Sequence, residues 1–387
     1  MMFIADADEL AEAAAYVAGA VMSQPPNPAL AGIQVSVDGP DDNTDQADGR
    51  GVGRLMLSAT DTQTYQRAGF EVGLTSPDHR GSVIVSGSML AAITKSLPAG
   101  EVVGTVVEGR LELRMKRSVY RVPIITEPFP ADPERWMLNG GFHVVPAPAL
   151  AQALAAVRHC VNDQSLHAPG VVLDMHPVHG LRVTAMSSSA LTTVTTPWGA
   201  TFTEEATQSV VALGLLEAAV HKPVGDIIGL GLNDGHIVVA QDGRDAQIRT
   251  FVESKAKLWQ RSLEGEAVGS ILADSAELLK ALRRIPLAML PNERELAGAA
   301  MAVVTEGGAS HITLVGRDKA AIEYIECKVA LAKKPIDVSL TVGLLADVLA
   351  TCGGREVSIE FRDRRLIITD ATESVQATHM VVLRREM

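Results

Sequence analysis

Gly87-Ser-Met-Leu90, Gly214-Leu-Leu216 and Gly343-Leu-Leu345 have similar sequences, and each is predicted to begin a helix. They are spaced at 214 − 87 = 127 and 343 − 214 = 129 residues. A short apolar strand is predicted after each of these helices, at Gly100-Glu-Val-Val103, Gly225-Asp-Ile-Ile228 and Gly354-Arg-Glu-Val357. A period of this length exceeds those of solenoids and propellers and matches the size of a whole domain. The sequence therefore predicts three like domains, whose packing around an axis would place the function in the overall shape.

Each predicted repeat also begins with an amphipathic helix. Apolar residues recur at helical spacing over 10–21, 150–161 and 278–285, and an alternating strand follows each stripe. Strands interrupted by two short helices are typical of the α+β class, with an antiparallel sheet that carries its helices on one face. Apolar periodicity lapses at 127–133 and 262–269, so the predicted domains are 1–133, 134–262 and 263–387.

The bulk composition indicates a globular chain. The 387 residues are 47% hydrophobic, and the formal net charge of −12 does not by itself favour nucleic-acid binding. We expect no signal peptide and no membrane span, because the first residues lack a basic region and 210–220 is short and contains Glu217. Cys160, Cys327 and Cys352 are scattered, which predicts a reducing cytoplasm, buried thiols and neither a disulfide framework nor a zinc site.

Three segments invite a chemical interpretation, and each has a simpler one. An EF-hand that began at Asp41 would need Gly at position six and Glu at position twelve, but Gln46 and Val52 stand there, which favours a solvated hairpin. His176 and His179 have no third metal ligand near them in sequence. The glycine-rich segment 49–53 leads into a strand rather than a helix, which a phosphate site would need. We therefore predict no metal and no cofactor.

Ser187-Ser-Ser189 is the one nucleophile-like cluster. It lacks the Gly-x-Ser-x-Gly elbow, and no His or acidic residue is tied to it by spacing. Because a catalytic triad can be assembled from remote positions, a serine acyl hydrolase remains an alternative from a different functional class.

Basic residues recur on the predicted helices. On the third-repeat helix Lys280, Arg283 and Arg284 lie at i, i+3 and i+4, opposite the apolar stripe. Lys95 and Lys222 end the Gly-x-Leu helices of the first two repeats, and Arg158 lies off the apolar stripe of the second-repeat helix. A solvated surface explains any one of these helices. Recurrence in several repeats favours equivalent positions around a central hole, although the first-repeat helix carries acids in place of bases.

Several stretches of the chain resemble the bacterial DNA polymerase III β subunit, the sliding clamp, and the likeness covers essentially the whole chain. The matching stretches are Gly81–Pro98, which is similar to a segment of actinobacterial clamps, Ser58–Asp61, Arg117–Arg121 and Met380–Leu383. The resemblance implies three domains of one fold per chain and a head-to-tail homodimer that encircles double-stranded DNA independently of its sequence. Helices would line the hole and sheets would form the outer wall.

The resemblance also implies a function without chemistry. Such a protein tethers the replicative polymerase to DNA, is loaded by a clamp loader, and works in the cytoplasm at the nucleoid. A ring holds DNA topologically and needs few phosphate contacts, which reconciles an acidic chain with DNA. The residues that face DNA would be the six bases of the predicted helices, namely Lys95, Arg158, Lys222, Lys280, Arg283 and Arg284. The dimer would join Arg117 and Tyr120 to a patch formed by Ile285, Leu287 and Met289.

The chain departs from the family at the partner-peptide groove. Met186-Ser-Ser-Ser-Ala-Leu191 replaces a Thr-Asp-Gly-His-Arg-Leu-like segment, and Leu383-Arg-Arg-Glu-Met387 replaces a Met-Pro-Met-Arg-Leu-like tail. We expect a groove formed by Met186, Ser188, Leu191, Val381 and Leu383 in which the family's fixed hydrogen bonds are missing. The alternative within the class is a clamp-like paralogue with altered partner specificity, in a resistance, regulatory or phage role.

Overall fold

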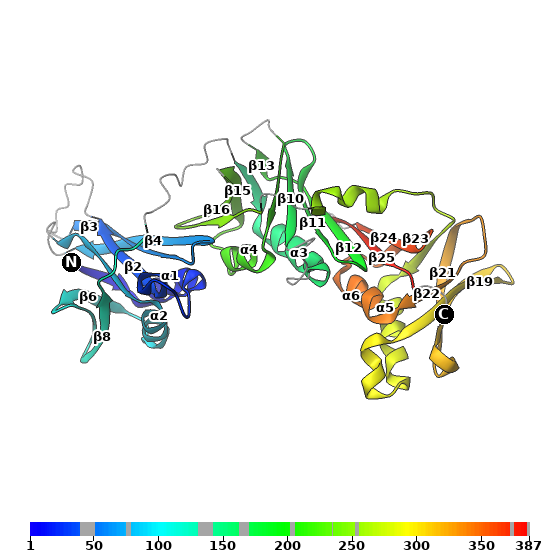
Figure 1. Ribbon diagram of the computed structural model, residues 1–387, viewed down its shortest axis with the longest axis horizontal. Helices are drawn as coiled ribbons and strands as arrows, with labels where there is room; N and C mark the ends of the chain where they lie inside the picture. The colour runs from blue at the N-terminus through cyan, green and yellow to red at the C-terminus, as the bar shows by residue number, and fades with distance from the viewer. Residues whose placement is uncertain are drawn as a thin grey trace. The chain divides into compact units, whose positions relative to one another are not determined.

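A computed structural model describes residues 1–38, 51–74, 79–130, 142–161, 170–201, 206–233, 235–251, 255–371 and 375–384. The elements repeat in the predicted order, namely a strand, a helix, four or five strands, a second helix and three strands (Figure 1). The α+β fold predicted from the sequence is confirmed.

The bounds of the elements follow this threefold order. The first repeat contains β1 (Met2–Asp6), α1 (Ala7–Val17), β2 (Gly32–Asp38), β3 (Gly51–Thr60), β4 (Thr64–Leu74), β5 (Gly81–Ser86), α2 (Gly87–Ser96), β6 (Glu101–Val107), β7 (Arg110–Met115) and β8 (Ser118–Ile125). The second contains β9 (His143–Pro146), α3 (Ala147–Val157), β10 (Val171–His176), β11 (Gly180–Met186), β12 (Ala190–Thr196), β13 (Ala200–Thr201), β14 (Thr207–Val211), α4 (Leu213–Val220), β15 (Ile227–Asn233), β16 (His236–Gln241) and β17 (Arg244–Arg249). The third contains β18 (Gly269–Asp274), α5 (Ser275–Arg284), β19 (Gly298–Glu306), β20 (Ala309–Gly316), β21 (Ile322–Ala332), β22 (Asp337–Thr341), α6 (Val342–Thr351), β23 (Glu356–Arg362), β24 (Arg365–Ala371) and β25 (Gln376–Val382).

The described chain forms two compact units, and their border runs through the predicted second domain. One unit is Met1–Val144 with Gly214–Arg249, and the other is Val145–Leu213 with Thr250–Met387. Strand pairing explains the division, because β17 pairs with β4 in the first unit and β12 pairs with β25 in the second. Each half of the middle repeat therefore shares a sheet with a neighbouring repeat. The predicted boundaries at 133 and 262 stay predictions.

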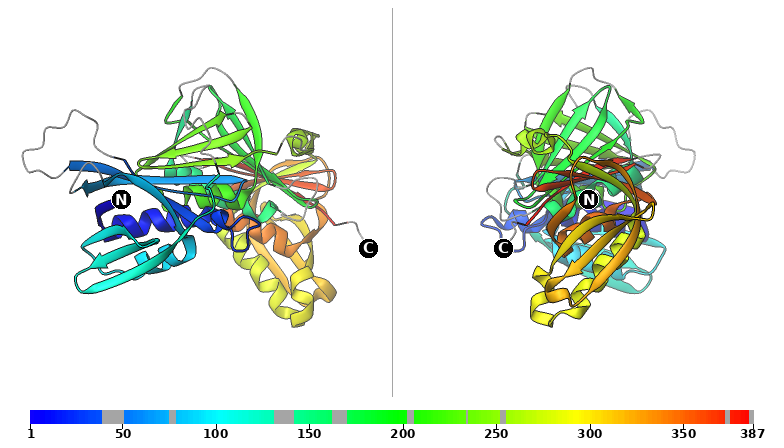
Figure 2. Two further views of the ribbon diagram at one scale, coloured as in Figure 1. Left: turned by 60° about the vertical axis from the view of Figure 1, so that its left-hand side comes forward. Right: turned by 90° about the vertical axis from the view of Figure 1, so that its right-hand side faces the viewer.

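The sheets are antiparallel and continuous across the repeats. In the first unit the strand order is β1-β6-β7-β8-β5-β2-β3-β4-β17-β16-β15, and β1 also pairs with β4. In the second unit it is β14-β10-β11-β12-β25-β24-β23-β18-β21-β20-β19-β22. Helices α1 and α2 lie together on one face of the first-repeat strands, and α5 and α6 lie together on one face of the third-repeat strands (Figures 1 and 2).

Local chemistry fixes where two of the helices begin. Asp6 caps α1, and its carboxylate accepts hydrogen bonds from the backbone N–H of Asp8 and of Glu9 at 2.9 and 3.2 Å. Asp274 caps α5 in the same way, with Oδ1 3.0 Å from the N–H of Ala276 and of Glu277. Such caps satisfy amides that have no partner inside the helix. The first and third repeats thus share a capping signal as well as an apolar stripe.

Each helix pair covers a separate apolar core. The first-repeat core includes Leu10, Val17 and Leu90, and the third-repeat core includes Leu278, Leu282 and Ile285. The described residues contain no helix long and apolar enough to cross a membrane. The cysteines are free, and Cys160 is buried as predicted, whereas Cys327 and Cys352 are half-buried.

A buried polar cluster lies where β12 pairs with β25. The hydroxyl of Thr192 is 2.9 Å from His379 Nδ1 and 3.2 Å from His159 Nε2, and it accepts a hydrogen bond from Cys160 Sγ at 3.3 Å. A hydroxyl has one proton and two lone pairs, so these three partners use its full capacity. Burial, and secondarily the neighbouring His159, lowers the pKa of His379 to about 3, and burial lowers that of His159 although Asp347 opposes the shift. Both rings are therefore neutral in the folded chain.

This cluster predicts loss of stability in mild acid. An unfolded histidine titrates near 6.5, so the stability that a neutral His379 contributes is complete above that pH and is lost as pH falls toward the folded value. Between pH 7 and pH 5 the free energy of unfolding should fall by about 2 kcal/mol because of this residue alone. Urea unfolding of the wild type and of His379→Asn, whose amide can still bond Thr192, measures the difference. Equal pH dependence of the two proteins would contradict the assignment.

Candidate nucleic-acid and partner surfaces

Helix α5 presents the densest group of bases on any predicted helix. Leu278, Ala281 and Leu282 are buried in the core, while Lys280, Arg283 and Arg284 are exposed on the other side. The predicted amphipathic arrangement of this helix is confirmed. Its role toward DNA stays a prediction.

Two of the three bases are paired within the chain. Lys280 Nζ is 2.8 Å from Glu277 Oε1, and Arg284 makes a two-point contact with Glu323 at 2.8 and 2.6 Å. The Arg284 guanidinium holds the pKa of Glu323 below its ordinary value. Arg283 has no carboxylate partner among the residues that the structure describes. The surface of α5 is therefore only mildly positive, which the spacing of the bases alone does not reveal.

The other predicted DNA-facing bases lie at the ends of helices. Lys95 is in the last turn of α2, Arg158 follows α3 and Lys222 follows α4, and all three are exposed. Cations at these ends are stabilised by the helix dipole, which is an ordinary structural reason for their position. Helix α1 lacks bases in the part described and carries Asp8, Glu9 and Glu12. Glu12 pairs with Arg244 of β17 at 2.9 Å.

The histidines and serines considered above for metal binding or catalysis make hydrogen bonds within their own turns. His176 Nδ1 accepts hydrogen bonds from the N–H of Val178 and of His179 at 3.1 and 3.2 Å, and the two imidazoles stack with centroids 4.2 Å apart. Ser187 Oγ accepts from the N–H of Ala190 at 3.0 Å. No group of three or more His, Cys, Asp or Glu side chains within the described ranges could hold a metal ion. The acidic loop 41–49 lies outside the described residues.

The predicted groove residues do not share one surface. Leu191 and Val381 are fully buried, and they lie in different apolar clusters. Val381 and Leu383 pack in the third-repeat core, whereas Leu191 packs with Met380 on the opposite face of the sheet. Alternate residues of a strand point to opposite faces of the sheet. Met380 and Val382 therefore lie on the same face as Leu191, where the sequence analysis had placed Val381 and Leu383. Met186 is half-buried beside Leu191, and Ser188 is exposed.

A segment that the sequence analysis did not single out covers this face. The 3₁₀ helix η5 (Lys255–Leu263) places Trp259, which is 4% exposed, over Leu191, Ile367 and Met380. We call this helix the connector, because it follows the middle repeat and precedes β18. A tryptophan flanked by Leu258 and Leu263 in a stretch rich in Lys, Gln and Arg was the available signal, but its target could be seen only in the folded chain.

The residues predicted to form the dimer interface also include both exposed and buried side chains. Leu287 is 65% exposed and Met289 is half-buried, but Ile285 is fully buried in the third-repeat core, so it cannot form part of a surface patch. The helical stripe continues to its end and turns Ile285 inward. Tyr120 is half-buried against the first-repeat core, while its neighbour Val119 is 46% exposed. Arg117 lies in the turn between β7 and β8.

Comparisons with known proteins agree with this architecture. Residues 1–130 match the family model described as DNA polymerase III beta subunit, N-terminal domain. The beta sliding clamp of Micrococcus luteus is 24% identical over 346 residues, which cover 84% of this chain and 99% of that protein. The DNA polymerase III subunit beta of Pseudomonas aeruginosa superposes with a TM-score of 0.81 at 19% identity, and that of Thermotoga maritima with 0.78 at 16%. Both structures are covered completely, as is this chain.

The whole chain therefore has the fold of a sliding clamp. Its first 130 residues match the family model of the DNA polymerase III beta subunit at low overall identity to the known clamps, and the resemblance predicted from its sequence is confirmed.

The position of Leu191 generates a stability prediction. Leu191→Ala would leave a cavity beneath Trp259 and should lower the free energy of unfolding by about 2–5 kcal/mol. Leu287→Ala is the matched control, since the same truncation at a side chain that is 65% exposed should change it by less than about 0.5 kcal/mol. Chemical denaturation measures both. Equal effects would show that Leu191 is a surface residue after all.

Proposed function

We propose that this chain is a DNA sliding clamp, a closed homodimer that encircles duplex DNA in the cytoplasm and tethers a polymerase to it. The observation that carries the proposal is the threefold element order, which matches sliding clamps over the full length of the chain. The N-terminal family match supports the same function. In this proposal the protein contributes a ring and performs no chemistry.

Two open sheet edges support a head-to-tail dimer. β8 pairs with β7 along its length, but on its other side only Ile124 and Ile125 pair with β5, within the described chain. β21 pairs with β20 only over 322–327, and with β18 only over 327–332. Unpaired strand edges favour association with another chain. Two different edges on one chain make a heterologous contact, which closes into a ring when the rotation fits.

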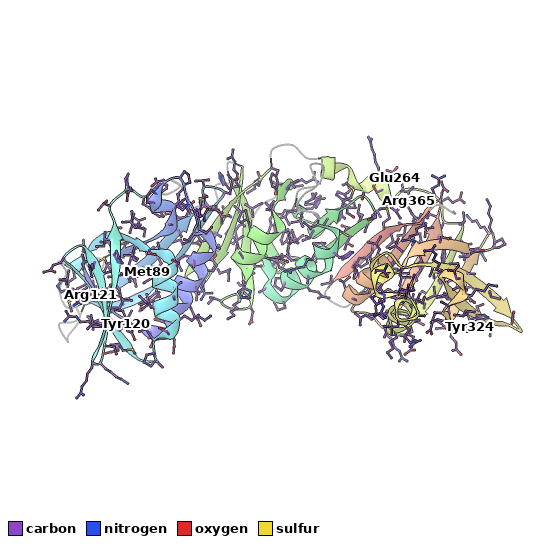
Figure 3. The ribbon with its side chains drawn as sticks, turned by 60° about the horizontal axis from the view of Figure 1, so that its bottom comes forward. Met89, Tyr120, Arg121, Glu264, Tyr324 and Arg365 are labelled. Atoms are coloured by element: carbon purple, nitrogen blue, oxygen red, sulfur yellow. The ribbon has the colours of Figure 1, made fainter. Side chains whose placement is uncertain are left out.

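The side chains at these edges suit one another. β21 exposes Tyr324 at 67% and Ile322 at 46%, and β8 exposes Val119 (Figure 3 marks Tyr120, Arg121 and Tyr324). The β7–β8 hairpin carries five bases, namely Arg110, Arg114, Lys116, Arg117 and Arg121. β21 carries Glu326, together with Glu323, which Arg284 pairs within the chain, and Lys328. Complementary charge steers association and fixes register more than it raises affinity.

A hollow in the third repeat offers room for an apolar anchor. It has a volume of about 900 Å³, and its lining includes Met289, Gly298, Ala300, Val315 and Leu340. Met289 is one of the residues predicted to lie at the interface. In the proposed dimer, the partner copy would place an apolar side chain of its β8 edge at or beside this hollow.

Retention on circular DNA tests the proposal directly. A bacterial clamp loader and ATP would place the labelled chain on a nicked circle, and gel filtration would separate bound from free protein. A clamp stays on the circle and leaves when a restriction enzyme linearises the DNA. Equal release from circular and linear DNA would contradict encirclement.

Serine acyl hydrolysis remains the alternative from another class. Ser187 Oγ is engaged by the backbone of its own turn, which favours a structural role for the cluster 187–189. A fluorophosphonate probe decides between the two, because stoichiometric labelling of a serine would overturn a function without chemistry.

The dimer model predicts a specific loss of affinity. Tyr324→Ala should raise the dimer dissociation constant by about 30-fold, which corresponds to about 2 kcal/mol for a central aromatic anchor. Tyr120→Ala together with Met289→Ala should act in the same direction. Val178→Ala is the control, since Val178 is 79% exposed in the turn between β10 and β11 and belongs to neither strand edge. Sedimentation equilibrium measures all of these proteins, and an unchanged constant in Tyr324→Ala would remove β21 from the interface.

The lining model predicts weak binding to DNA that is independent of sequence. Replacing Lys280, Arg283 and Arg284 with glutamine should lower affinity for open linear DNA equally on all sequences. The slope of log affinity against log salt should fall by about one unit for each phosphate that the protein no longer neutralises. Arg283→Gln alone should account for most of the change, since it is the base of α5 without a carboxylate partner in the described structure.

A charge-matched variant controls for net charge. Arg249, Arg261 and Arg364 are exposed at the end of β17, on η5 and in the turn between β23 and β24. Their replacement with glutamine removes the same charge outside helices α1 to α6 and outside both proposed dimer edges. This variant should retain the wild-type salt slope. Equal slopes in both triple variants would show that α5 is not a DNA surface.

A further inference from the structure

A row of apolar side chains crosses the sheet at the joint between the middle and third repeats. Leu191 of β12 is paired in register with Met380 of β25, and Met380 is paired with Ile367 of β24. The three side chains form one buried cluster with Trp259. Since the third-repeat core lies on the opposite face, only the connector covers this row within the described residues.

The connector is held by arginines rather than by strand pairing. Arg365 Nη1 donates to the carbonyl of Ser262 at 2.6 Å, and Arg362 donates to the carbonyl of Leu263. Arg182 lies with its guanidinium carbon 5.5 Å from the centre of the Trp259 ring. Figure 3 marks Arg365 and Glu264 close to the end of this segment. A few polar contacts to backbone carbonyls are easier to exchange than a strand ladder.

Trp259 itself is incompletely satisfied. Its Nε1–H is buried and has no hydrogen-bond partner in the structure. A buried indole usually finds an acceptor, because an unpaired buried donor costs about 1–3 kcal/mol. The aromatic ring is thus well packed while its polar group gains nothing from the site. This combination makes the contact replaceable by a segment that brings its own apolar side chain.

We infer that the connector is a built-in occupant of a partner-binding face, and that Trp259 must be displaced before a partner's apolar anchor can bind there. The inference rests on the proposed clamp function, because it concerns how that clamp's partner surface is regulated. The partner is a short extended segment that ends in a large apolar side chain. Its terminal carboxylate would pair with Arg365, which the departing Ser262 carbonyl leaves without its acceptor.

Fluorescence of Trp259 tests the displacement. In a chain carrying Trp136→Phe and Trp198→Phe, Trp259 is the remaining tryptophan. A hexapeptide ending in Leu-Phe should shift its emission to longer wavelength and increase quenching by iodide. The same peptide ending in Ala-Ala is the control and should do neither. Binding that leaves the emission of Trp259 unchanged would overturn the inference.

Removing or loosening the cover tests its inhibitory role. Calorimetry should show that Trp259→Ala binds the Leu-Phe peptide at least tenfold more tightly than the wild type. Arg362→Ala, which removes the hydrogen bond to the Leu263 carbonyl and leaves Arg365 in place, should tighten binding in the same direction and serves where Trp259→Ala does not fold. Trp198→Ala, which removes an indole from a turn of the middle repeat, should bind as the wild type does.

The outcomes separate this inference from the clamp assignment. Weaker binding by Trp259→Ala would make the indole part of the binding surface and would overturn the inference. No binding by any variant would do the same. Retention on circular DNA, measured on the same preparations, reports on the clamp function independently of Trp259.

Discussion

The strand pairing between neighbouring repeats is the constraint on which the rest of this structure depends. β4 with β17, and β12 with β25, supply backbone hydrogen bonds that no single repeat could supply to itself. A sheet edge left open in water is prone to non-native association, so each repeat gains from completing its neighbour. The two compact units follow from this pairing. So does the apolar row at the second joint, because it exists only when β12 lies against β25.

The two joints use different chemistry around the same backbone arrangement. At the first, Arg67 of β4 pairs with Asp245 of β17 at 2.8 Å, and both side chains remain partly exposed. At the second, Thr192, His159 and His379 form a buried neutral cluster. A partly exposed ion pair weakens with salt, whereas the neutral cluster weakens when a histidine gains a proton. The joints should therefore respond to different solution conditions.

Sequence alone predicted the features that repeat and missed those that depend on tertiary packing. The repeat of about 127 residues and the stripe of α5 are local patterns, and both hold in the structure. The face of Val381 was wrong because a strand buried on both sides offers no polar alternation to set its register. Ile285 was assigned to a surface because the end of an apolar stripe does not show whether another element covers it. The packing of Trp259 on Leu191 joins positions 259 − 191 = 68 residues apart, which no local period encodes.

The paired strands also constrain how such a chain can recombine with a relative. The first joint needs β4 and β17 from one parent, and these strands lie at Thr64–Leu74 and Arg244–Arg249. The second needs β12 and β25, at Ala190–Thr196 and Gln376–Val382. Any single crossover between residues 75 and 375 therefore separates the members of at least one pair. Within this range, hybrids would inherit matched joints only from two crossovers placed to keep both pairs whole, so one repeat cannot be exchanged by itself.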